Sequence, residues 1–239
     1  MLKQHKFLTI ALMLGLAFTA VAQADDQPWK KITKQSNVTK FAKAEILLEQ
    51  NFTDADTEVV IVAKGGATGL KYFWLLAPDG KLVYEFTSPN NGRNLGGREI
   101  VVESPEPPEL DKVLKAYPEG IYRFIGKAFD GQWLYSEAVL SHKLPPPASI
   151  TFPLQDGIVL PSALSVTWES AEEAAAYVIE LKHVDSGREL VVDIAGEQKM
   201  FQAPEKWLIP GALYQLGVIS INQMGNKIVV ETTFSTGVE

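Results

Sequence analysis

The sequence contains no cysteine, and its only three histidines are His5, His142 and His183. The missing cysteine excludes disulfides, thiol nucleophiles, Cys-ligated zinc and iron–sulfur clusters. A basic surplus is missing as well, because 22 Lys and Arg stand against 29 Asp and Glu and give a net charge of −7. This balance argues against a dedicated nucleic-acid-binding protein.

Long apolar runs are absent except at the N-terminus. Residues 7–22 are apolar but for isolated Thr and Gly, follow Lys3 and Lys6, and end in Ala22-Gln23-Ala24. This pattern predicts a signal peptide at 1–24, cleaved after Ala24. An uncleaved anchor is the alternative, but the run is shorter than the ~20 residues that a spanning helix needs. We therefore expect a periplasmic or secreted protein with no membrane span after cleavage.

The segment that follows, residues 25–43, is polar and carries five lysines and Trp29. Such a composition is typical of a solvated leader of no fixed structure, and we predict a disordered leader here. The alternative is a cationic arm that meets an anionic envelope surface, with Trp29 as its anchor.

Short apolar runs cut by turn residues make up the rest of the chain. Turn sequences such as Pro78-Asp79-Gly80 and Gly225-Asn226 separate them. This spacing, without a sustained helical period, predicts an all-β fold of sandwiches. One short helix is expected at 107–116. The expected strands are 44–49, 58–63, 70–77, 81–86, 99–103, 120–129, 132–142, 149–152, 164–168, 176–184, 189–194, 199–202, 213–222 and 227–236.

Three consecutive prolines, Pro145 to Pro147, divide these strands into two groups. Such a run cannot join a sheet and favours a stiff spacer. The two halves also share a faint repeat, since Tyr122 and Tyr214 each stand four residues after a proline. We predict two tandem immunoglobulin/fibronectin-III-like β-sandwiches, at 44–143 and 149–239, joined by a Pro-rich linker at 144–148.

The second half resembles a fibronectin type III domain. The resemblance rests on the run 165–168 ending in Trp168, the strand at 176–181, the Leu208-x-Pro210-x-x-x-Tyr214 corner and a loop at 222–226. It implies that Trp168 lies in the core and that the Tyr214 hydroxyl bonds back across the corner. The first half is more divergent and Ig-like, with Tyr122 as its possible corner.

No catalytic or cofactor motif accompanies these strands. A hydrolytic triad needs a histidine base, and the candidates His142 and His183 stand beside no nucleophile motif, so we read them as surface or hinge residues. Acidic groups near 103–111 and 169–173 fall in expected loops. Asn51, Asp54 and Asp56 are interpreted as an ordinary turn, with a calcium loop as the alternative. The sequence thus predicts a non-enzymatic protein without cofactor or metal.

Aromatic residues give the remaining signal. The run 72–76 is apolar on both alternating faces, so its second face is either buried or an exposed patch. Loops on a rigid sandwich also carry recognition. The candidate binding surface therefore comprises Tyr72, Trp74, Tyr84, Trp133, Asn222 and Asn226. We predict a binding or scaffold protein with a protein partner; the alternative is a carbohydrate-binding accessory protein that stacks glycans on Trp74 or Trp133.

Overall fold

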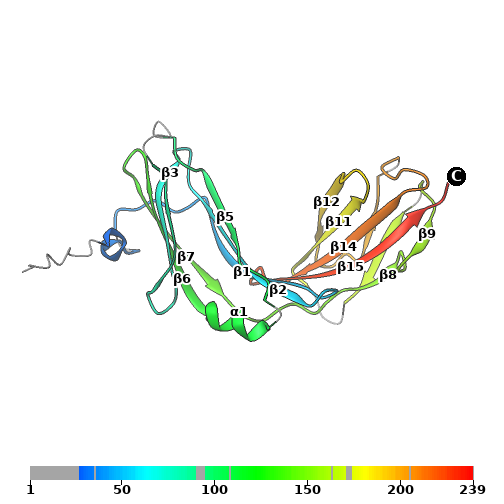
Figure 1. Cartoon of the computed structure of the whole chain (residues 1–239), viewed down its shortest axis with the longest axis horizontal. Helices are drawn as coiled ribbons and strands as arrows, with labels where there is room; N and C mark the ends of the chain where they lie inside the picture. Colours follow the sequence, from blue (N-terminus) through cyan, green and yellow to red (C-terminus); the bar gives the residue numbers. More distant parts are fainter. Residues whose placement is uncertain are drawn as a thin grey trace, which may run out of the picture.

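The computed structural model describes residues 27–34, 36–89, 95–107, 109–162, 164–170, 174–204 and 206–238. The predicted signal peptide at 1–24 lies outside these residues. Two β-sandwiches form the arms of a V (Figure 1). In the part of the chain described, no helix is long and apolar enough to cross a membrane.

The first sandwich packs a three-stranded layer against a four-stranded sheet. Their inward faces enclose a core around Ile61, Phe73 and Phe124, all at most 1% exposed. The helix α1 (Leu110–Ala116) joins the layers and adds Val113 to this core. The strands are β1 (Lys43–Asn51), β2 (Asp56–Lys64) and β5 (Glu99–Glu103) in one layer, and β4 (Leu82–Thr87), β3 (Leu70–Leu76), β6 (Gly120–Ala128) and β7 (Trp133–Leu140) in the other.

The second sandwich repeats this arrangement. Its core holds Trp168, Tyr177 and Phe234, again almost wholly buried. One layer is β8 (Ser149–Phe152), β10 (Ser165–Glu169) and β13 (Met200–Gln202); the other is β12 (Glu189–Ala195), β11 (Ala176–His183), β14 (Leu213–Ile221) and β15 (Lys227–Thr236), with β9 (Gly157–Val159) paired to β15.

The two sandwiches share one sheet. The start of β15 pairs in parallel with the end of β1, from Glu49 opposite Lys227 to Asn51 opposite Val229. The result is a sheet in the order β12-β11-β14-β15-β1-β2-β5, with β9 beside β15. The all-β sandwich fold predicted from the sequence is confirmed. The strand pairing between the sandwiches was not anticipated, because the Pro-rich linker suggested two independent units.

The linker residues 144–148 form no strand but contact both cores. Leu144 packs against the first core, whereas Ala148 is buried in the second. Three prolines between these two anchors keep the connection extended. The linker therefore adds to the docking of the two sandwiches.

The described part of the N-terminal segment packs on the first sandwich. It forms a 3-10 turn, η1 (Pro28–Lys31), and Thr39 makes a parallel bridge to Leu134. Phe41 is 6% exposed and enters the first core beside Gly126, where a Cβ would lie only 2.7 Å from its ring. The prediction of a disordered leader is therefore wrong for the described residues of 27–42, because their apolar side chains cover the outer face of the β3-β6-β7 layer.

Candidate functional site

The shared sheet lines the inner side of the V (Figure 1). Side chains alternate across it, so Ile46 and Leu48 face the first core while Leu47 and Glu49 face the opposite way. The parallel pairing of β1 with β15 continues this alternation into the second sandwich. We call the side of the sheet away from the two cores the concave face.

Acidic and apolar side chains share the concave face. The apolar side chains far from the vertex of the V, the place where β15 pairs with β1, are more exposed than those near it. Val101 and Val191 are 56% and 55% exposed, whereas Ile219 is only 4% exposed. Lysines on this face are fewer than acids, and the ammonium of Lys227 lies 2.8 Å from the Glu49 carboxylate. The residues that the register assigns to this face include the apolar Leu47, Val60, Val62, Val101, Val178, Val191, Ile219, Ile221 and Val229, the acids Glu45, Glu49, Asp56, Glu58, Glu99, Glu103, Glu180, Glu189, Asp193 and Glu231, and the lysines Lys43, Lys64, Lys182 and Lys227.

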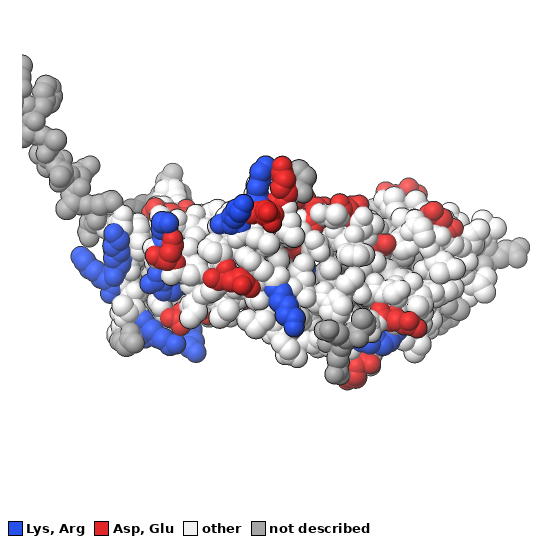
Figure 2. All heavy atoms as spheres, turned by 90° about the horizontal axis from the view of Figure 1, so that it is seen from below, with Lys and Arg blue, Asp and Glu red and all other residues white. Residues whose placement is uncertain are grey.

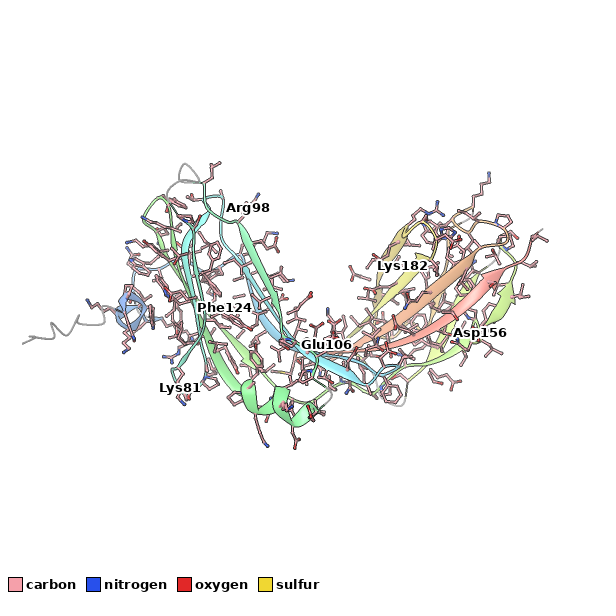
Figure 3. All side chains as sticks on the ribbon, viewed as in Figure 1. Lys81, Arg98, Glu106, Phe124, Asp156 and Lys182 are labelled. Carbon is pink, nitrogen blue, oxygen red and sulfur yellow. The ribbon has the colours of Figure 1, made fainter. Side chains whose placement is uncertain are left out.

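At the vertex the carboxylates surround a hollow of about 200 Å³. Burial, followed by the charges of Glu103 and Glu49, raises the pKa of Glu58 from 4.5 to about 7. Burial and the charges of Glu189 and Glu49 also raise the pKa of Glu180. Glu106 lies at the same junction (Figure 3). The vertex is therefore a place where negative charge is poorly compensated.

The loop between β14 and β15 binds the first sandwich at this vertex through side-chain hydrogen bonds. Asn226 is 1% exposed; its Oδ1 accepts from Leu48 N at 2.9 Å, and its Nδ2 donates to the carbonyls of Ser141 and Lys143. Asn222 Nδ2 donates to the same Lys143 carbonyl at 2.6 Å. The prediction that Asn222 and Asn226 lie on an open recognition loop is therefore wrong for Asn226, because the first sandwich takes up its side-chain hydrogen bonds.

The predicted aromatic surface divides between two faces of one sheet. Trp74, Tyr72 and Trp133 gather on the outer face, with Trp74 ring centroids 5.4 Å and 6.1 Å from the other two. Trp74 itself is only 2% exposed, because Trp29 of the N-terminal segment lies 5.3 Å from it. Tyr84 points to the inner face, where its hydroxyl lies 2.6 Å from that of Tyr117. Tyr84 is thus not part of this cluster.

The three predicted structural aromatics lie inside the cores. Trp168 is 2% exposed, and Tyr122 and Tyr214 are wholly buried. The Tyr122 hydroxyl donates to the Pro118 carbonyl at 3.0 Å, and the Tyr214 hydroxyl accepts from Ile209 N at 2.8 Å. Both rings therefore tie the start of a strand to the chain just before it, as in a tyrosine corner.

Each sandwich packs two β-layers around one core and carries one tyrosine corner, as the sequence predicts. No protein-family model and no curated protein matches the chain. Among solved structures, it is similar to a segment of two fibronectin type III domains from chicken tenascin, at 12% identity over 82% of this chain and 99% of that segment, with a TM-score of 0.32. It is also similar to the FN1–FN3 domains of chicken CNTN1, at 15% identity over 84% of this chain and 65% of that one, with a TM-score of 0.34.

The two histidines among the described residues lie in different sandwiches. His142 Nε2 is 2.8 Å from the Tyr117 carbonyl oxygen, and His183 Nδ1 is 2.6 Å from the Ser186 hydroxyl. In the predicted turn at 51–56, Asn51 Nδ2 donates to Asp54 and its Oδ1 accepts from Thr53 N. Among the residues that the structure describes, no three His, Asp or Glu side chains are grouped to hold a metal ion.

Proposed function

We propose that this chain is a non-enzymatic exported binding or scaffold protein and that its concave face receives a protein partner. The observation that carries the proposal is the pairing of β15 with β1, which makes one unbroken sheet face from two sandwiches. A partner that spans both arms then meets a surface whose geometry is set before binding. Preorganisation of this kind lowers the entropic cost of association.

The chemistry of the concave face favours a partner with basic and apolar side chains. Val101 and Val191 offer apolar contact on the two arms, and they are flanked by Glu99, Glu103 and Asp193. Complementary charge accelerates encounter and excludes acidic competitors. A lysine- or arginine-bearing protein surface would also relieve the repulsion among the vertex carboxylates.

Export and the lack of catalysis belong to the same proposal. The signal-peptide pattern at 1–24 supports a periplasmic or secreted location. His142 bonds to a backbone carbonyl, and His183 Nδ1 accepts from the Ser186 backbone N–H within its own turn, which supports a structural role for both imidazoles. Mass spectrometry of the exported protein would test the location, and a mature chain that does not begin at Asp25 would contradict the expected cleavage.

The concave face is tested by capture from envelope extracts with the mature protein as bait. We expect the double variant Val101→Arg/Val191→Arg to weaken the complex at least tenfold, about 1.4 kcal/mol, because like charge and bulk enter the face on both arms. Ile121→Arg is the matched control, since Ile121 is 51% exposed on the outer face of the other sheet. Equal capture by all three proteins would refute the assignment of the concave face.

A further inference from the structure

A second hollow lies on the opposite side of the first sandwich. Its volume is about 430 Å³, and its walls carry the rings of Trp29, Tyr72 and Trp133 around buried Trp74. Volumes of this size suit small ligands. We call it the tryptophan hollow. It contains no residue of the concave face, so the inference drawn from it is independent of the proposed function.

The rings of the tryptophan hollow are held in place by one another. Trp74 stacks on Tyr72 with an interplanar angle of 15° and on Trp133 with one of 27°. Its indole Nε1 donates to the Glu85 carboxylate at 3.1 Å. Tyr72, Trp133 and Trp29 remain half-buried, so the hollow offers fixed aromatic surface without needing Trp74 to be exposed.

Charged groups complete the hollow. The ammonium of Lys127 lies 5.0 Å from the Trp133 ring centroid, and that of Lys71 lies 5.4 Å from the Tyr72 ring centroid. Glu85 is the acidic residue of the hollow lining, and one of its oxygens already accepts from Trp74. Lys and Arg side chains also gather at the end of the molecule that carries the N-terminal segment (Figure 2). The lining itself holds one lysine and one carboxylate, and Lys71, which lies outside the lining, adds a second ammonium beside the Tyr72 ring.

We propose that the tryptophan hollow binds an acidic oligosaccharide. A pyranose ring presents C–H bonds on its flat faces, which pack against indole rings such as Trp29 and Trp133. Its hydroxyls can donate to Glu85, and a carboxylate on the sugar would pair with Lys127. Because Trp29 comes from the N-terminal segment, that segment builds part of the site.

Intrinsic fluorescence tests this proposal directly, since Trp29, Trp74 and Trp133 are three of the five tryptophans. The mature protein is titrated with a panel of hexuronate trisaccharides and with their methyl esters, which keep the rings but lose the charge. We expect the fluorescence of the wild-type protein to change saturably with at least one acidic trisaccharide and at least fivefold more weakly with its ester.

Variants locate the binding. Trp133→Ala and Trp29→Ala should each weaken binding of the acidic trisaccharide at least tenfold, whereas Lys127→Gln should bring its affinity to that of the ester. Trp207→Phe is the matched control, because Trp207 also lies under a cation, Arg188, but in the second sandwich. Retained urea midpoints show that a variant is folded, and the two tryptophan variants check each other.

Three results would overturn the proposal. The first is the absence of any saturable change with the whole panel at millimolar concentration. The second is binding that survives both Trp133→Ala and Trp29→Ala. The third is equal affinity for acid and ester, which would remove the role of Lys127. None of these results bears on capture of a protein by the concave face, so the two proposals fail separately.

Discussion

At the scale of single residues, two buried hydroxyls differ in what they contribute. Tyr214 and Ser220 are both wholly buried. The Tyr214 hydroxyl accepts a hydrogen bond from Ile209 N, whereas the Ser220 hydroxyl has no hydrogen-bond partner among the described residues. Removing a buried partner leaves a polar group unsatisfied, but removing an unpartnered hydroxyl does not.

Tyr214→Phe is therefore expected to lower the free energy of unfolding by about 1–3 kcal/mol, because the Ile209 N–H loses its acceptor. Ser220→Ala is the control and should leave that free energy unchanged or raise it. Urea unfolding followed by circular dichroism measures both. Equal losses in the two variants would contradict the role given to the tyrosine corner.

Glu58 makes stability depend on pH. Its folded-state pKa of about 7 lies above its ordinary value of 4.5, so the folded protein binds more protons than the unfolded chain in that interval. The free energy of unfolding should therefore fall as the pH rises from about 4.5 to about 7. Glu58→Gln should flatten this decline, measured as urea midpoints at pH 5 and pH 8. Glu99→Gln, a change on the neighbouring edge strand, is the control and should leave the fall in unfolding free energy with pH intact. An unaltered pH dependence in Glu58→Gln would argue against a titrating carboxylate at the vertex.

At the scale of elements, the junction of β1 and β15 depends on a few side chains. Besides the Asn226 hydrogen bonds, Asn51 Nδ2 donates to the Glu231 carboxylate at 2.9 Å, and Phe52 N donates to the Val229 carbonyl at 2.8 Å. These contacts fix the register in which the two strands meet. The angle between the sandwiches is therefore set by hydrogen bonds rather than by the linker alone.

Asn226→Ala should lower the free energy of unfolding by about 2–3 kcal/mol, since it leaves Leu48 N and the Ser141 carbonyl without their partner at a buried site. Asn222→Ala should cost less, because Asn222 is only half-buried. Chemical denaturation of both variants measures the difference. A smaller loss of unfolding free energy for Asn226→Ala than for Asn222→Ala would contradict the stabilising role given to the Asn226 hydrogen bonds.

The strands were largely predictable, because alternation and turn residues are local signals. The bounds of β5, β8 and β15 match the expected ranges, while three-residue β9 is too short to show a period. Tyr84 was misplaced because a register shift at Leu75 and Leu76 puts Glu85, not Tyr84, opposite Trp74. A single extra residue turns every later side chain to the other face.

The site was harder to predict than the fold. Ile46, Leu47 and Leu48 make β1 apolar on both of its faces. The same pattern at residues 72–76 was taken to indicate a second buried or binding face, and in β1 it lies next to the vertex. Gly225-Asn226 has the same turn chemistry whether its loop is free or docked, so its sequence could not show that Asn226 would be buried. Trp29 stands in a polar segment, and only the fold brings it to Trp74.

At the scale of the whole molecule, the shared sheet makes one body of two domains. Contacts at a domain interface usually permit relative motion. Here β1 of the first sandwich pairs with β15 of the second, and the buried side chain of Asn226, from the second sandwich, bonds to backbone groups of the first. The concave face should therefore keep one shape in solution, which is what the proposed binding of a partner across both arms requires.

The most direct test is the distance between the arms, measured by pulsed electron paramagnetic resonance. The chain has no native cysteine, so Arg98→Cys/Lys182→Cys places spin labels only at these exposed positions on facing arms (Figure 3). We predict a single narrow distance distribution. A broad or multiple distribution would contradict the claim that the pairing of β1 with β15 fixes the two sandwiches as one body.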